Sequence, residues 1–311
     1  MFLKSLRESS AATQIAFTAV VILVCGLSFI IIGFIAGWLI FGLGLQQMQV
    51  ALTDFTSPQG VTLLKFFQVV QSIGLFIVPP FIVAFLLDGK PSVFLRYKQF
   101  PVLKSIILVI AIVYLSEPLI NWLNEINSKL VLPQGLSALQ KWMEQSEEQA
   151  GKVTDAFLKT SSVSGLLFNL FMIGLLPALG EELLFRGVVQ QLLKKWSGNA
   201  HTAIWISAAI FSALHLQFFG FLPRLLLGAM FGYMLEWSGT LWLPVIAHFV
   251  NNGTAVVAYF LLNKGMVSKD IDKVGTSSDG SSYLVLLSIV FLILLFRSLY
   301  FQYKRAEAGN N

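Results

Sequence analysis

The chain has 311 residues, of which 56% are hydrophobic and 12% are charged, and its mean hydropathy is +0.76. Soluble domains carry about twice that charged fraction, so the composition excludes an ordinary soluble domain. The net charge of +5 comes from basic residues scattered among short loops, which argues against a nucleic-acid-binding surface and is typical of membrane topology.

Long apolar runs along the chain predict about eight membrane crossings. A helix needs about 20 apolar residues to cross a bilayer. Lipid offers the backbone no hydrogen-bond partner, so such runs must form helices or a closed barrel, and their length without strict alternation excludes the barrel. The predicted fold class is therefore an all-α, polytopic transmembrane helical bundle. The expected spans are 12–44, 63–87, 102–122, 162–193, 200–219, 221–237, 241–263 and 281–302.

The first apolar run is too long for the hydrophobic core of a signal peptide, so we expect it to be retained as a helix. Its Cys25 is the single cysteine of the chain, which excludes an internal disulfide and a multi-cysteine metal site. Glu117 and Pro118 interrupt the third run, which is expected to end early. The first and fourth runs exceed the bilayer thickness and must tilt, kink or protrude.

The distribution of basic residues predicts the orientation. With eight crossings, the basic residues before the first helix, between the second and third, after the fourth and after the last all fall on one side, and the longer opposite loops are neutral or slightly acidic. Both termini are therefore expected to be cytoplasmic in an integral cell-membrane protein. Arg224, near the turn between the fifth and sixth helices, does not fit this pattern. The residues that define the basic side are Lys4, Arg7, Lys90, Arg96, Lys98, Lys104, Lys194, Lys195, Lys304 and Arg305.

The loops divide the chain into three expected parts: residues 1–160 with about three helices and a large outer loop, residues 161–262 as the functional core, and residues 263–311 with a loop, the last helix and a tail. In the outer loop, 136–143 fits either an amphipathic surface helix or a solvated segment. Residues 269–282 are expected to form a loop. Gly228 and Gly232 form a small-xxx-small pair, which permits close approach of a neighbouring helix.

Three predicted helices carry polar side chains that lipid penalises. A charged side chain at mid-bilayer costs about 2.5–3.5 kcal/mol on insertion scales, and such residues usually face a cavity or a partner. Their concentration here predicts a buried functional site. The residues are Glu181, Glu182 and Arg186 in the fourth helix, His215 in the fifth, and His248 and Asn252 in the seventh.

Helical periodicity assigns different roles to the two adjacent glutamates. Glu182 and Arg186 are four residues apart, so they share a helix face and can form an ion pair that supports the site. Glu181 is turned away by about 100° and has no partner nearby in sequence. An unpaired carboxylate in a low-dielectric site suits a general base.

The two histidines share helix faces with Phe211 and Asn252, respectively. A carboxylate and a histidine can activate water, while a second histidine and an amide can donate hydrogen bonds to an oxyanion. The same acid and two histidines could instead ligate zinc with an open position. No G-x-S-x-G or H-E-x-x-H motif is present. The residues therefore predict hydrolysis with water as the nucleophile.

These motifs, in this order and on separate helices, resemble the CAAX protease and bacteriocin-processing family of intramembrane endopeptidases, also called the Abi or type II CAAX prenyl endopeptidase family. The resemblance covers about residues 161–255, a third of the chain, and includes the run 239–248 before the third motif. The matching residues are Glu181, Glu182 and Arg186 for E-E-x-x-x-R, Phe211 and His215 for F-x-x-x-H, and His248 and Asn252 for H-x-x-x-N.

The resemblance implies peptide-bond hydrolysis in which Glu181 and His215 activate water and His248 and Asn252 form the oxyanion hole. The expected substrate is a hydrophobic or lipid-modified peptide or protein in or at the bilayer.

The resemblance further implies that Glu182 and Arg186 hold the fourth helix in place. No obligatory cofactor is expected, because an oxyanion role uses both polar side chains of the seventh helix. A zinc ion held by Glu181, His215 and His248 is the alternative.

Two other functions compete with this interpretation. A non-catalytic membrane scaffold or regulator could keep the family fold without its chemistry. A proton-coupled transporter could also use intramembrane glutamate and histidine. Transporters commonly contain inverted repeats with broken helices in both halves, and the sequence has no matching half, which disfavours that class.

Overall fold

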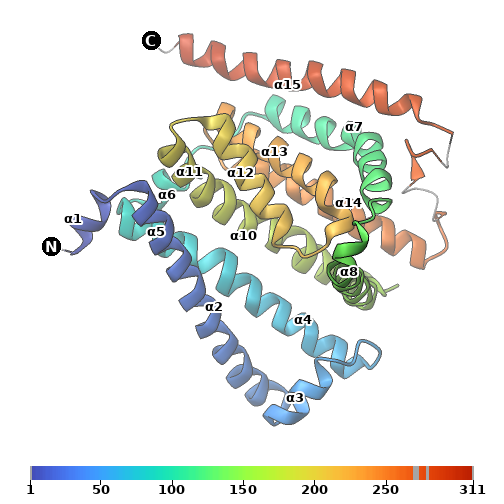
Figure 1. Ribbon diagram of the computed structural model, residues 1–311. Coiled ribbons are helices and arrows are strands. Elements are labelled where there is room, and N and C mark those ends of the chain that lie inside the picture. The colour runs from blue at the N-terminus through green and yellow to red at the C-terminus, as the bar shows by residue number, and fades with distance from the viewer. Residues whose placement is uncertain (1, 269–272, 278–279, 310–311) are drawn as a thin grey trace.

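The computed structural model describes residues 2–268, 273–277 and 280–309, and this part of the chain is helical without strands (Figure 1). The predicted all-α class is therefore confirmed. Residues 269–272 and 278–279 of the predicted loop lie outside the described residues.

The helices are named in chain order, with η marking π-helical or 3₁₀ segments. The N-terminal elements are α1 (Phe2–Arg7), α2 (Ala11–Phe41), α3 (Leu45–Ala51), α4 (Pro58–Ser72), η1 (Ile73–Ile77), α5 (Val78–Leu87) and α6 (Pro91–Phe94). The next elements are α7 (Leu103–Ser128), η2 (Gln134–Leu136) and α8 (Ser137–Leu158). The remaining elements are α9 (Val163–Asn169), η3 (Leu170–Leu175), α10 (Leu176–Leu184), η4 (Phe185–Val189), α11 (Gln190–Ser197), α12 (Ala200–Ala213), η5 (Phe218–Gly220), α13 (Phe221–Ser238), α14 (Trp242–Asn263) and α15 (Tyr283–Gly309).

Seven helices of the described chain are long and apolar enough to cross a membrane. Their composition agrees with a multi-pass integral membrane protein. The fifth expected crossing, 200–219, differs: its helix α12 has only 14 residues, about 21 Å at 1.5 Å per residue, and a turn and η5 follow it. In Figure 1, α12 still pairs with α13 as a helical hairpin, and the start of α2 and the end of α15 lie toward the same side of the bundle.

The outer loop is more helical than its apolar pattern indicates. α8 covers 22 residues, whereas the sequence allowed at most a short helix over 136–143. Trp142 of this helix packs against Phe218 of η5, with ring centroids 5.1 Å apart. Glu147 accepts a hydrogen bond from the backbone N–H of Phe219 at 3.4 Å. Contacts with a segment about 70 residues away therefore fix this helix, and no local pattern reports them.

One long helical path, residues 163–197, carries the first polar motif through the centre of the bundle (Figure 1). It is continuous through five segments, and π-helical η3 and η4 flank α10 on both sides. Pro177 lies in the first turn of α10 and has no N–H to donate, which disturbs the regular ladder in η3. Short π-helical segments within α-helices, such as η3 and η4, frequently occur at functional sites.

Close packing between helices places this central path. Gly180 lies against η1, where an added Cβ would be 2.8 Å from Phe76 Cβ. The close helix approach predicted for Gly228 and Gly232 is also present, between α13 and α12. A Cβ on Gly228 would be 3.1 Å from Ala208 Cβ, and one on Gly232 would be 2.9 Å from Ile204. Small residues thus let α10 approach η1, and α13 approach α12.

Replacing Gly180 by alanine is expected to lower the free energy of unfolding by about 1–3 kcal/mol, because the new methyl overpacks the contact with η1. The matched control is Gly151→Ala in α8, where nothing lies within 4 Å of an added Cβ. That change should stabilise the protein by about 1 kcal/mol through helix propensity. Thermal unfolding of detergent-purified protein measures both, and equal shifts for the two variants would contradict the packing argument.

Candidate active site

A fully buried ion pair supports the site. Glu182 is 0% exposed and Arg186 is 1% exposed. The Nη1 of Arg186 donates to Glu182 Oε1 at 2.9 Å, and its Nη2 donates to the Gly228 carbonyl oxygen at 2.9 Å. The guanidinium also lies over the Phe211 ring, 4.7 Å from the centroid. The predicted pair is therefore present, and it also joins η4 to α13.

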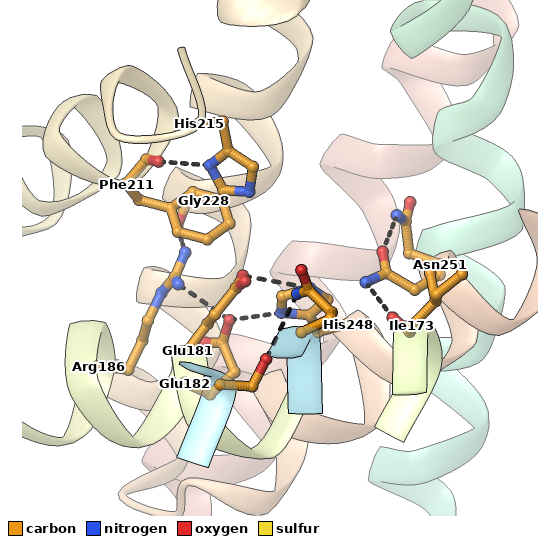
Figure 2. Close-up of polar contacts among 12 residues, drawn as sticks. Ile173, Glu181, Glu182, Arg186, Phe211, His215, Gly228, His248 and Asn251 are labelled. Atoms are coloured by element: carbon orange, nitrogen blue, oxygen red, sulfur yellow. Dashed lines mark hydrogen bonds and ion pairs between the residues drawn. The ribbon is translucent and has the colours of Figure 1, made fainter. Parts of the chain in front are cut away.

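His248 joins the two glutamates. Its Nδ1 donates to Glu182 Oε1 at 2.9 Å, while its Nε2 lies 3.8 Å from Glu181 Oε2 (Figure 2). The ring stacks on Phe231 at 5.4 Å with an interplanar angle of 24°. Because one nitrogen is held by a buried carboxylate, the orientation of the ring is fixed and Nε2 is the nitrogen presented to Glu181.

His215 lies in the turn that follows α12. Its Nδ1 donates to the backbone carbonyl of Phe211 at 2.8 Å, and its ring meets the Phe211 ring edge-on at 4.9 Å. The same Phe211 ring is 6.2 Å from His248. The Nδ1–H bond leaves Nε2 as the unprotonated nitrogen of a neutral His215, which can accept a proton. Figure 2 shows the side chain beside Phe211, above Glu181 and Glu182 in the view.

Asn252 extends the site along α14, one turn beyond His248. Its Nδ2 donates to the Ile173 carbonyl oxygen in η3 at 3.1 Å, and its Oδ1 accepts from Asn251 Nδ2 at 3.1 Å. The amide keeps one further N–H of its own. The π-helical segment before the first polar motif thus orients this amide.

The described structure brings Glu181, Glu182, Arg186 and His248 into direct contact and places His215 against Phe211. Glu181 and His215 form no ion pair with each other, so the nearest imidazole to Glu181 is His248. Among the described residues, no group of three or more His, Cys, Asp or Glu is arranged to hold a metal ion. The zinc set considered from the sequence therefore does not fit this arrangement.

Sequence reasoning missed the groups that hold the site from outside the motifs. Phe231 stacks on His248, and the backbone carbonyls of Gly228 and Ile173 accept from Arg186 and Asn252. The small-residue pair Gly228 and Gly232 was the one sequence feature that could have indicated such an acceptor, because a glycine leaves its carbonyl accessible to a neighbouring helix. Every residue has a backbone carbonyl, so the sequence does not otherwise indicate which carbonyl accepts a hydrogen bond.

Comparisons with known proteins point to the region of the chain that contains these residues. Residues 163–254, from the start of α9 into α14, match the family described as type II CAAX prenyl endopeptidase Rce1-like. The chain is also similar to the "Uncharacterized protein YpbD" of Bacillus subtilis (strain 168), with 30% identity over 117 residues. That similarity covers 36% of this chain and 55% of YpbD, so the chain spans about half the length of this curated relative. No solved structure matches the chain. Residues 163–254 of this membrane protein are thus a domain of the Rce1-like type II CAAX prenyl endopeptidase family.

Proposed function

We propose that the protein is an intramembrane endopeptidase that hydrolyses hydrophobic or lipid-modified peptides with an activated water. The observation that carries the proposal is the buried Glu182, which holds Arg186 and His248 together and so presents His248 Nε2 beside Glu181. A purely structural ion pair would not need a second carboxylate against the same imidazole.

In this proposal, Glu181 and Nε2 of His215 activate the attacking water by accepting hydrogen bonds from it, and Glu181 takes its proton. The water oxygen bonds to the carbonyl carbon of the peptide, and the carbonyl oxygen becomes an oxyanion. His248 carries a proton on both ring nitrogens in this step, so its Nε2–H and the Asn252 amide stabilise that charge by hydrogen bonds. The C–N bond then breaks, and the proton taken from water passes to the leaving amine. One water and one amide thus give one carboxylic acid and one amine.

The roles of the supporting residues follow from their contacts. Glu182 orients His248 through Nδ1, and Arg186 fixes the Glu182 carboxylate by a hydrogen bond at 2.9 Å. A fixed imidazole stabilises a transition state without reorganising during the reaction. We place the basic side predicted from the sequence, which includes Lys98, in the cytoplasm by the positive-inside rule. Labelling a cysteine introduced at Lys98 with a membrane-impermeant reagent tests that side.

The test is cleavage of a library of hydrophobic peptides by detergent-purified protein in water enriched in oxygen-18. The expected result is new product carboxylates that carry the heavy isotope, because the nucleophile is water. Glu181→Ala should produce none of these products while His201→Ala, which alters the histidine that binds Tyr233 outside the site, should produce all of them. Equal cleavage by Glu181→Ala and the unmodified protein would overturn the catalytic assignment and favour a scaffold.

A further inference from the structure

A cationic cavity lies away from the proposed active site, at the basic side of the bundle. Its volume is about 460 Å³, and it is bounded by the segment after α6, by α11 and by α13. Three cations and one carboxylate line it, which gives a net charge of +2. These residues are Arg96, Lys194, Lys195 and Glu236. α11 continues directly from η4, so the cavity is at the cytoplasmic end proposed for the central helical path.

Arg96 has a backbone conformation that is unfavourable for its residue type. Its φ is 57°, in the left-handed region that favours glycine. Such strain persists where the surrounding structure imposes it, and it concentrates at ligand-binding positions. A glycine at this position would relieve the strain, so the chain keeps an arginine side chain at an energetic cost.

The Rce1-like domain imposes this conformation. The backbone N–H of Leu241 donates to the Arg96 carbonyl at 2.9 Å, and Trp242 Nε1 donates to the Tyr97 carbonyl at 2.9 Å. Gln191 Nε2 donates to the Phe94 carbonyl at 2.8 Å. These three bonds hold the backbone of the segment on both sides of Arg96 and direct the arginine to the cavity.

The arginine is the cation without a protein partner in this cavity. Lys194 Nζ lies 2.5 Å from Glu236 Oε1, and Lys195 Nζ donates to Gln14 Oε1 at 3.0 Å. Arg96 is half-buried and forms no hydrogen bond or ion pair through its side chain with the rest of the described chain. A planar guanidinium with all its donors available suits a phosphate, which it can bind with two parallel hydrogen bonds.

Exposed apolar side chains close in sequence to the residues that line the cavity indicate that the phosphate belongs to a lipid. Phe100 is 66% exposed and Leu103 is 70% exposed in the segment after Arg96, and Trp196 of α11 is 57% exposed. Aromatic and apolar side chains at this level sit at the boundary between headgroups and acyl chains. Basic cavities between helices on the cytoplasmic side are suited to anionic headgroups.

We propose that this cavity binds the headgroup phosphate of an anionic phospholipid, with Arg96 as the main ligand and Lys195 as a second cation. The site is separate from the proposed active site and does not depend on peptidase activity.

The experiment measures lipids retained by the full-length protein in a neutral detergent by native mass spectrometry. Phosphatidylglycerol and phosphatidylcholine are added in turn. The expected result is preferential retention of phosphatidylglycerol, reduced about tenfold by Arg96→Gln through the loss of a charged hydrogen bond. The matched control is Lys98→Gln, an exposed cation in the same segment that does not line the cavity, and it should retain the lipid as before.

A second variant separates binding from folding. Arg96→Gly keeps the left-handed backbone without strain, so its melting temperature in lipid-free detergent should be unchanged or higher, while lipid retention falls as in Arg96→Gln. Unchanged retention in either Arg96 variant would overturn the proposal. Inorganic phosphate is added in a separate arm: retention of phosphate with no preference between the two lipids would show a site for a free anion and would also overturn it.

Discussion

Glu181→Gln is expected to lower the rate of peptide hydrolysis by about 10²–10⁴-fold, the usual contribution of a general base. Glutamine has the same shape but cannot take the proton of the attacking water. The stability of the protein should change little, because within the described residues the one ion-pair contact of this carboxylate is the 3.8 Å approach to His248 Nε2. The measurement is the cleavage rate of one peptide identified from the library, together with thermal unfolding of the same preparation.

Glu182→Gln provides the comparison for this prediction. It replaces the carboxylate that accepts from both Arg186 and His248 at 2.9 Å, so it should lower both the cleavage rate and the melting temperature. We thus expect Glu181→Gln to lower only the cleavage rate, and Glu182→Gln to lower both the cleavage rate and the melting temperature. If Glu181→Gln cleaves the peptide at the unmodified rate, or if both substitutions lower only the melting temperature, the proposed roles are wrong.

Arg186→Met is expected to lower the free energy of unfolding by about 3–5 kcal/mol, the cost of leaving a buried charge without its partner. Methionine fills much of the volume but donates no hydrogen bond. Glu182 would remain fully buried, with His248 as its single hydrogen-bonding partner and its Oε2 without one in the described structure. The Gly228 carbonyl would also lose its donor.

The control for the arginine substitution is an ion pair at the surface. Lys152 Nζ lies 2.7 Å from Glu148 Oε1 with both side chains about half exposed or more, so Lys152→Met should cost at most about 1 kcal/mol. A double variant, Glu182→Met with Arg186→Met, should be less destabilised than Arg186→Met alone, because no buried charge remains unpaired. Thermal unfolding in detergent measures all three. An Arg186→Met protein as stable as the unmodified one would show that the pair does not support the fold.

The sequence could predict contacts between residues close together in the chain, but not contacts between residues far apart in it. The pair Glu182–Arg186 was predictable, since residues four apart share a helix face in any helix. The contact of His248 with Glu182 was not, because the two residues are 66 positions apart and the packing of α10 against α14 decides which side chains meet. The unpaired state expected for Glu181 changed for the same reason: an imidazole from another helix lies 3.8 Å away.

The boundaries of the helices show the same distinction. Hydrophobic length predicted eight crossings, and seven of them correspond to helices of the described chain that are long enough to cross a bilayer. The remaining predicted crossing, 200–219, merged the 14-residue α12 with the turn and η5 behind it, because that turn is as apolar as the helix. The amphipathic α8 was underestimated, since its charged residues resemble a solvated loop until contacts with η5 are known.

The sequence by itself determined the all-α membrane class, the three polar motifs and the family to which they point, because hydropathy, residue type and helical periodicity are local properties. The tertiary structure alone decided which carboxylate holds His248, which backbone carbonyls accept from Arg186 and Asn252, and how the backbone of Arg96 is held against the domain. Those contacts join segments tens to more than a hundred residues apart, and only the packing of helices sets the distances between them.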